Sequence, residues 1–510
     1  MDPLTVAVFA EICQAFKIPC NQTPRRAVLD YGGDEPGGSD LIFNTPVFFY
    51  FFLLFVTLYG LVLASRRHRV FLIVLASLVF YGAWNYRFIP LLIGSGVADY
   101  LIAQRIGASS DQRTRRRWLT LSLVINLGIL GLFKYADFVL TSVADFIALF
   151  GAEVSLPTLA WVLPVGISFY TFQSLSYTID VYRRDMEPRK GLVEFLAALS
   201  FFPQLVAGPI LRARQILPQM HALPVPTWDN IKHGCLLITA GVFKKTVADL
   251  LAVPAERIFD SANPASLLET WTGILAFAGQ IYGDFAGYTD MAIGLALLLG
   301  FKIPLNFRLP YFAVSPVDFW RRWHISLSTW LRDYLYISLG GNRNKRRLRN
   351  VMITMLLGGL WHGAAWTFVV WGAYHGVLIV VTHAISKVRA FAAFGADSSR
   401  GLRLFKWAVT FHLVLVGWVL FRAGGIADAG EIVARMHGLR VLPAAGAQAG
   451  LIFGLVVGLL LFMHLMDLCV IRGGEWLKRH AWFMWILLIL FQAICLLAGE
   501  PSNDFIYFQF

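Results

Sequence analysis

The sequence predicts an all-α protein that crosses a membrane many times, and three observations support this prediction. Hydrophobic residues make up 57% of the 510 residues, and the mean hydropathy is +0.62. Charged residues make up 15%, whereas a soluble domain carries roughly 25%. The apolar residues gather in runs close to the ~20 residues that a helix needs to cross a bilayer, with short basic loops between them. We expect one membrane-embedded domain and no separate soluble domain.

Residues 1–40 differ from the rest of the chain and are predicted to form an extracytoplasmic N-terminal extension. Residues 1–18 are weakly apolar, are interrupted by Glu11 and Lys17, and show no clear signal-peptide cleavage site. Residues 32–40 are rich in glycine and acidic residues. The membrane domain is therefore placed at 41–510.

Basic loops set the predicted orientation of the first spans. The run 47–64 is followed at once by Arg66, Arg67 and Arg69, which places this loop in the cytoplasm and the N-terminus outside. The next loop with many arginines, 105–117, is cytoplasmic by the same argument. An extracytoplasmic stretch with room for a surface helix is expected at 136–160. Further spans are expected at 70–84, 88–103 and 118–135.

The middle of the chain is less regular. The run 161–181 carries Ser, Thr, Tyr and Gln side chains at a density that suits contact with protein or water, not lipid. Residues 201–210 are interrupted by Pro203 and Pro209 and are predicted to form a re-entrant or cavity-lining segment. Plain spans are expected at 233–248 and 268–282, and a short apolar continuation at 294–301.

The region 302–350 contains no apolar run of lipid length. It carries ten Lys or Arg against two Asp, and Arg343–Arg349 is its densest basic cluster. Alternating basic and non-basic loops then give a C-terminus outside the cytoplasm and roughly eleven spans in all. The remaining spans are expected at 351–360, 364–385, 407–421, 451–469 and 482–497.

Two histidines in polar, aromatic surroundings form the leading site candidate. His324 lies in DFWRRWHISLS (318–328), and His362 lies in GGLWHG (358–363). Polar groups are costly at membrane depth and usually line a protein interior or a cavity. The glycines beside His362 allow backbone or substrate to approach closely, and Trp361 supplies an aromatic wall. A histidine that only packs between helices is the alternative at each position.

The sequence does not favour a metal, a bound cofactor or nucleic acid. The histidines show no HxxxH or HExxH spacing, and no cysteine lies near His324 or His362 in the sequence. The net charge of +13 is spread over short loops between apolar runs, as the positive-inside rule expects of a membrane protein.

Seven motifs with mixed polar, aromatic and glycine residues occur along the chain. They are LPVGISFYTFQSLSY (163–177), FFPQLVAGPILR (201–212), IYGDFAGYTDMAIG (281–294), DFWRRWHISLSTWLRDYLYISLGGNR (318–343), LLGGLWHGAAWTFVVWGAYHG (356–376), GWVLFRA (417–423) and FIYFQF (505–510). In this order they resemble the membrane-bound O-acyltransferase (MBOAT) family. Within that family they are most like the bacterial group that holds the alginate O-acetyltransferase membrane subunit and the teichoic acid D-alanyl transfer protein. The resemblance runs over 41–510, and residues 1–40 depart from it.

The resemblance implies a ring of about eleven tilted transmembrane helices, with re-entrant segments, around a tunnel. It places the family's near-invariant histidine at His362 and a second family histidine at His324, both as catalytic residues. The donor, acetyl-CoA or an acyl-carrier thioester, would arrive from the cytoplasm. The acceptor would be hydroxyls of an exopolysaccharide such as alginate, or of another envelope glycan. The resemblance further implies a bacterial inner-membrane location and a periplasmic partner of the SGNH-hydrolase type.

Acyl transfer to a hydroxyl requires a group that removes the acceptor's proton. A neutral imidazole suits this role because the unperturbed pKa of histidine is ~6.5, and no G-x-S-x-G elbow suggests a serine nucleophile. For the basic cluster at 343–349, capture of a phosphate-bearing donor and anchoring on anionic lipid both stay open. Ion pairing within the segment is the alternative for Asp318 and Arg321. The predicted substrate-binding residues are Asp318, Arg321, Trp361 and Arg343.

Two other functions stay open. One is transfer of D-alanine or another acyl group from a carrier protein to an envelope polymer, or to a small secreted molecule. The other belongs to a different class, a channel or transporter whose polar spans line a permeation path. The sequence shows no internal repeat, which argues against a transporter built from inverted halves.

Overall fold

Within the residues that the structure describes, the protein is built from helices, and no β-strand occurs among them. The computed structural model describes residues 41–472 except 42, 44, 261–264, 344–345, 387–398 and 441, together with Ile486. The predicted extension at 1–40 and, apart from Ile486, the predicted span at 482–497 lie outside the described residues.

The prediction of an all-α polytopic membrane protein is confirmed. Five helical stretches in the described part are long and apolar enough to cross a membrane. The larger total of spans and the tunnel stay predictions. The five stretches are Arg66–Ala108, Gln112–Ala148, Trp366–Ile385, Arg400–Arg422 and Ala449–Val470.

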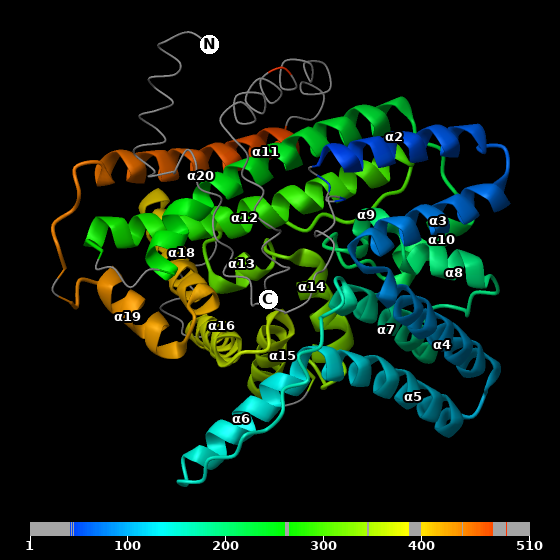
Figure 1. The fold of residues 1–510 in the computed structure, drawn as a ribbon, viewed down its shortest axis with the longest axis horizontal. Helices are drawn as coiled ribbons and strands as arrows, with labels where there is room; N and C mark the ends of the chain where they lie inside the picture. The colour runs from blue at the N-terminus through cyan, green and yellow to red at the C-terminus, as the bar shows by residue number, and fades with distance from the viewer. Residues whose placement is uncertain are drawn as a thin grey trace.

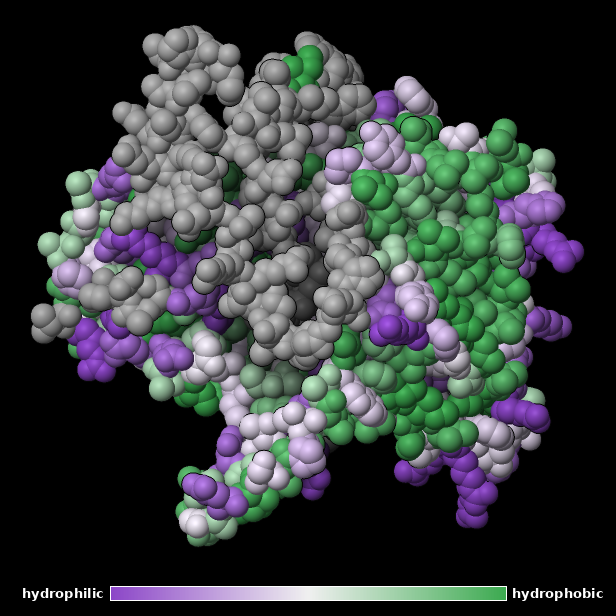
Figure 2. Space-filling view, viewed as in Figure 1, coloured by the Kyte–Doolittle hydropathy of each residue, from purple (hydrophilic) through white to green (hydrophobic). Residues whose placement is uncertain are grey.

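The N-terminal helices form one side of the molecule (Figure 1). Space-filling shows this side as a broad apolar surface (Figure 2), and the exposed apolar side chains of these helices include Phe49, Leu53 and Phe71. Such a surface suits contact with lipid. A π-helical turn joins the fourth of these helices to α6, which projects from the body in Figure 1 and lies where a surface helix was predicted. The elements are α2 (Pro46–Leu61), α3 (Arg66–Asn85), η1 (Tyr86–Phe88), α4 (Ile89–Ala108), α5 (Gln112–Leu130), η2 (Gly131–Tyr135) and α6 (Ala136–Ala148).

The polar helix α7 (Ile167–Arg183) is buried along almost its whole length, as its hydroxyls and amides predicted. The carboxylate of Asp99 on α4 accepts hydrogen bonds from Ser122 at 2.6 Å and Asn126 at 2.7 Å, both on α5, and from Ser174 on α7. A buried carboxylate costs free energy unless such donors satisfy it. This network therefore holds α4, α5 and α7 together.

The proline-interrupted segment 201–210 is covered by protein. Its only helix is the short α9 (Phe202–Leu205), and every residue from 201 to 210 is buried. Backbone outside a helix is tolerated at membrane depth only when protein covers it, so this burial agrees with the predicted re-entrant or cavity-lining segment. Along the chain, this segment lies between α8 (Leu192–Leu199) and α10 (Ala213–Ala222).

Two long helices, α11 (Trp228–Phe259) and α12 (Leu267–Leu298), replace the shorter spans predicted at 233–248 and 268–282. Those predicted boundaries were wrong, since each helix runs for 32 residues. The reason is charge pairing within α11 and between α11 and α12. Lys245 on α11 lies 2.7 Å from Asp249 and 2.8 Å from Asp284, and Lys244 lies 2.5 Å from Asp290. The paired carboxylates can remain inside a helix, so α12 continues through them.

The described elements between 302 and 346 are short, which agrees with the lack of an apolar run of lipid length in 302–350, although α15 already begins at Arg347. They are followed by longer helices that complete the fold, and Figure 1 places α13 to α16 near the centre of the molecule. The elements are η3 (Pro310–Phe312), α13 (Pro316–Trp320), α14 (Ile325–Trp330), η4 (Leu331–Tyr336), α15 (Arg347–His362), α16 (Trp366–Ile385), α18 (Arg400–Arg422), α19 (Ile426–Met436) and α20 (Ala449–Arg472).

Candidate functional site

His324 is held in place by Asn306. It precedes α14 in a left-handed backbone conformation with φ of +43°, and its side chain is fully buried. Its Nδ1 lies 3.1 Å from Oδ1 of Asn306. Because the backbone N–H of Ser326 also donates to that oxygen, at 3.2 Å, the neutral imidazole donates from Nδ1 and keeps the lone pair on Nε2. Sequence reasoning missed Asn306, which lies 18 residues before His324.

His362 is the last residue of α15 and shares an aromatic enclosure with His324. It is 5% exposed, and the centroids of the two imidazole rings are 6.3 Å apart. Trp361 contacts both rings, with centroids 5.9 Å from His324 and 5.0 Å from His362. Trp371 and Phe421 close the other sides of His362, at 5.1 and 5.4 Å. The structure therefore brings together three of the predicted site residues.

The glycines beside His362 serve the packing of α15 on α16. A Cβ at Gly359 would lie 2.2 Å from the backbone oxygen of Phe368, and one at Gly363 would lie 2.0 Å from the Phe368 ring. No side chain fits at either distance. Close approach of protein, which was one of the two predicted uses of these glycines, is thus what the structure shows.

Lys134 binds the end of α15 that carries His362. Its Nζ donates to the carbonyl oxygen of Trp361 at 2.7 Å and to that of His362 at 3.0 Å. The next residue, Tyr135, donates its hydroxyl to the carbonyl of Leu360 at 2.9 Å. The last carbonyls of a helix have no partner within the helix, and the negative end of its dipole attracts a cation. Sequence reasoning missed Lys134, although an isolated lysine in an apolar run signals a specific partner.

The other predicted site residues lie elsewhere. Asp318 forms an ion pair with Arg322 at 2.9 Å and accepts a hydrogen bond from the backbone of Val314 at 3.2 Å, so the predicted bracing of this segment is present. Arg321 and Arg343 are exposed, unlike the buried histidines, and can contact only a ligand that reaches the surface. A further buried histidine, His375, packs against Trp371 with ring centroids 4.8 Å apart.

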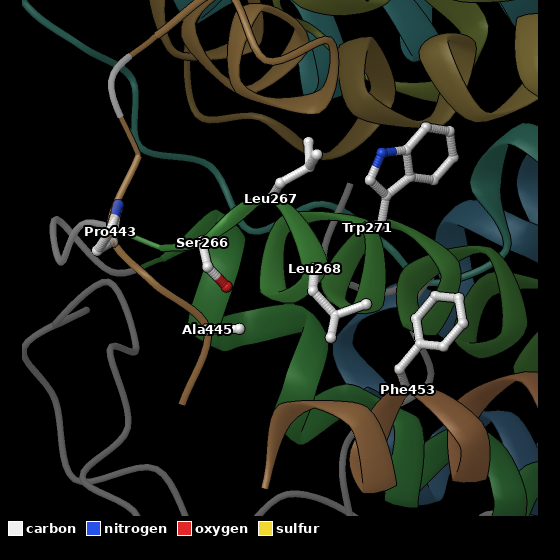
Figure 3. Close-up of a pocket in the computed structure, with 7 residues that line it drawn as sticks. All are labelled: Ser266, Leu267, Leu268, Trp271, Pro443, Ala445 and Phe453. Atoms are coloured by element: carbon white, nitrogen blue, oxygen red, sulfur yellow. The ribbon is translucent and has the colours of Figure 1, made fainter. Parts of the chain in front are cut away.

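An apolar cavity of about 430 Å³ lies apart from these residues (Figure 3). It is formed by the start of α12, the start of α20 and the chain before α20, and no predicted site residue lines it. Among the described residues, no three His, Cys, Asp or Glu side chains are grouped as a metal site. The lining residues are Ser266, Leu267, Leu268, Trp271, Pro443, Ala445 and Phe453.

Comparison with known proteins agrees with the residue-level resemblance. The model of the membrane-bound O-acyltransferase family matches residues 188–422, which include both histidines. The chain is 43% identical over 432 residues to a probable alginate O-acetylase of Pseudomonas aeruginosa, a match that covers 84% of this chain and 80% of that protein. This chain belongs to the membrane-bound O-acyltransferase family. It is accordingly an acyltransferase and a multi-pass membrane protein.

Two further relatives differ in their named substrates. A peptidoglycan O-acetyltransferase of Helicobacter pylori is 38% identical over 432 residues, covering 78% of this chain and 80% of that protein. A teichoic acid D-alanyltransferase of Bacillus subtilis is 28% identical over 274 residues, covering 50% and 68%. The MBOAT family match thus extends to proteins named for different acyl groups and polymers.

Proposed function

We propose that this MBOAT protein moves an acetyl group from a cytoplasmic thioester donor across the membrane toward hydroxyls of an extracytoplasmic glycan, which the group reaches through a periplasmic partner. The observation that carries the proposal is the pair of buried imidazoles, His324 and His362, whose ring centroids lie 6.3 Å apart within one aromatic enclosure. Identity of 38–43% to two proteins named as O-acetylating enzymes supports acetyl as the group transferred. The glycan could be an exopolysaccharide such as alginate, and the donor acetyl-CoA or an acyl-carrier thioester.

The two histidines take different parts in this chemistry. His362 accepts the proton of the acceptor hydroxyl while the hydroxyl oxygen attacks the thioester carbonyl. The carbon–sulfur bond then breaks, and the leaving thiolate takes up the proton. His324 keeps its lone pair on Nε2 because Asn306 holds its Nδ1–H, so it accepts a hydrogen bond and orients a substrate hydroxyl or amide. Burial disfavours the charged imidazolium and keeps out water that would hydrolyse the thioester.

Acetylation of the native acceptor by purified variants tests the proposal. His362→Gln keeps hydrogen bonding but cannot accept a proton. We expect its rate of acetyl transfer to fall about 10²–10⁴-fold, which is the contribution that general-base catalysis typically makes. His324→Ala should lose less activity than His362→Gln if His324 only orients the substrate. His383→Gln is the matched control, because His383 is half-buried and its Nδ1 lies 2.8 Å from a carbonyl of its own helix. A His362→Gln enzyme that works near the wild-type rate would remove the proton-transfer role.

Location and partners follow from the same proposal. The basic loops at 66–69 and 105–117 support a cytoplasmic position for these loops. On this basis we expect both termini in the periplasm and a bacterial inner membrane as the setting. A periplasmic SGNH-type partner would carry the acetyl group on to the glycan. Co-purification with the partner, together with glycan acetylation that depends on both proteins, tests this part separately.

D-alanyl transfer is the second candidate, favoured by the 28% identity to a teichoic acid D-alanyltransferase. That match covers half of this chain, whereas the matches to the two O-acetylating relatives each cover more than three quarters of this chain. Supplying purified protein with acetyl-CoA in one reaction and a D-alanyl carrier thioester in another separates the two. Turnover of only the carrier thioester would replace the acetyl proposal.

A further inference from the structure

Two histidines that are distant along the chain meet where α19 packs on α18. His412 lies on α18, and His437 directly follows the last residue of α19. Their Nε2 atoms are 3.1 Å apart, and their ring centroids are 5.1 Å apart with the ring planes at 81°. Because 25 positions separate them, the short histidine spacings of metal-binding motifs could not reveal them. We call His412 and His437 the histidine pair.

The backbone of α19 orients His437 so that its Nε2 faces the other ring as an acceptor. Its Nδ1 lies 2.8 Å from the carbonyl oxygen of Val433, four residues earlier. A carbonyl oxygen can only accept, so in the neutral ring Nδ1 carries the proton and Nε2 keeps the lone pair. Histidines that bind a metal almost always donate their other ring N–H to a carbonyl or a carboxylate in this way. His437 therefore has the tautomer that metal binding requires.

The separation of the two Nε2 atoms fits a shared metal ion. Zn–N bonds are ~2.0–2.1 Å long, so two nitrogen ligands at a tetrahedral angle lie about 3.3–3.4 Å apart. The 3.1 Å between His412 and His437 is close to that value. The alternative is a hydrogen bond that His412 donates from its Nε2 to the lone pair of His437. That bond fits the same distance but gives no affinity for a metal, so an experiment separates the two.

The histidine pair lies on a side of the molecule that suits water. His437 is exposed and His412 is half-buried. Although α18 is long and apolar enough to cross a membrane, α19 brings charged residues to this side of it. Arg440 and Glu431 form an ion pair at 2.9 Å, with side chains 58% and 35% exposed, and such groups rarely face lipid. Water can therefore fill the metal positions that two protein ligands leave open, as it does in open zinc sites.

A metal ion on the histidine pair would hold three helices together. The indole of Trp271 on α12 lies against His412, with ring centroids 5.8 Å apart, and its Nε1 donates to the carbonyl of Met436 at 3.1 Å. Trp271 also lines the apolar cavity of Figure 3, as does Pro443 from the chain that follows α19. The ion would thus fix the end of α19 against α18 and α12, beside one wall of this cavity.

We propose that the histidine pair binds a divalent transition metal of the zinc class and that this ion fastens α19 to α18. Imidazole suits zinc, copper and nickel, whereas Mg²⁺ and Ca²⁺ prefer oxygen ligands. Two protein ligands with water make an open, exchangeable site, unlike the closed four-ligand sites of structural zinc. The proposal is independent of the acyl transfer assigned to His324 and His362.

Equilibrium binding of Zn²⁺ tests the site without relying on turnover. Full-length protein without a polyhistidine tag is placed in nanodiscs of zwitterionic lipid, freed of metal with a chelator and titrated with ZnCl₂ against a chromophoric competitor. We expect His437→Gln to bind Zn²⁺ at least ~10–100-fold more weakly than wild type, because even the loss of a hydrogen bond to a metal ligand costs that much. His383→Gln is the matched control and should bind as wild type. The Nδ1 of His383 makes the same contact with a carbonyl of its own helix, that of Ile379 at 2.8 Å.

Copper identifies the ligands directly. In the electron paramagnetic resonance spectrum of the Cu²⁺-loaded wild type, we expect hyperfine splitting from two imidazole nitrogens. His412→Gln and His437→Gln should each show splitting from a single nitrogen. The melting temperature, measured with and without ZnCl₂, checks that each variant is folded. It should rise with the ion only in proteins that keep both histidines, since a ligand of the folded state stabilises it.

Three results would overturn the proposal. The first is a wild type that binds Zn²⁺ no more tightly than His412→Gln/His437→Gln, which would leave only a hydrogen bond between the rings. The second is a copper spectrum that neither single substitution changes, which would place the ion elsewhere. The third is a melting temperature that is lower in the metal-free variants but does not respond to Zn²⁺ in the wild type. If His412→Gln does not fold, His437→Gln decides alone, because its side chain is exposed.

Discussion

Replacing Lys134 tests whether the end of α15 must be held for catalysis. Its Nζ donates to the carbonyls of Trp361 and His362 at 2.7 and 3.0 Å, and a hydrogen bond to a charged group contributes ~1.5–3 kcal/mol. Two such bonds hold the end of α15 with about 3–6 kcal/mol. If half of that free energy keeps His362 in its reactive position, Lys134→Met lowers kcat by about 10–100-fold, since each 1.36 kcal/mol is a factor of about ten.

The assay is steady-state acetyl transfer by purified protein, with thermal unfolding followed in parallel. We expect kcat to fall while the KM for the donor changes little, because Lys134 acts through the backbone of His362. Lys134→Arg keeps the charge and should restore part of kcat. Tyr135→Phe is the matched control, as it removes one neutral hydrogen bond from the same helix end, worth ~0.5–1.5 kcal/mol. A kcat for Lys134→Met that equals the wild type, or that falls no further than in Tyr135→Phe, would refute the reasoning.

Three further predictions concern packing, charge and orientation. Gly359→Ala places a Cβ 2.2 Å from a backbone oxygen of α16. We expect this variant to lose ~1–3 kcal/mol of stability and to lose activity. An unchanged melting temperature would contradict the close packing of α15 on α16. Lys245→Met removes the ion pairs of Lys245 with Asp249 and Asp284, and we expect it to lower the free energy of unfolding by ~3–5 kcal/mol. The triple variant, in which both aspartates are also changed to asparagine, should recover much of this stability in thermal unfolding. No recovery would show that charge pairing is not the cause. Single cysteines at 66–69 and 105–117 should resist an impermeant reagent added to intact cells, and strong labelling would reverse the predicted orientation.

The sequence alone determined the class of the protein, and it predicted the pair of histidines that the structure brings together. Apolar runs of membrane length are visible without a fold, because every backbone polar group in lipid has to be satisfied within its own helix. His324 and His362 were recognisable for a related reason, since polar side chains are costly at membrane depth and usually face a protein interior or a cavity. The burial of 201–210 was predictable from its two prolines, since backbone that leaves the helix has to be covered by protein.

Partners that are distant along the chain could be identified only in the tertiary structure. Lys134 lies 228 residues from His362, and no local pattern relates an isolated lysine on one helix to the last carbonyls of another. Asn306 sets the tautomer of His324 from a segment without regular structure, which offers no periodicity to extrapolate. The boundaries of α12 were misjudged for the same reason, because Asp284 and Asp290 look like an interruption until the lysines of α11 lie beside them. Periodicity and composition report what one segment needs, whereas ion pairs, helix-end hydrogen bonds and ring stacks depend on which segments the fold brings together.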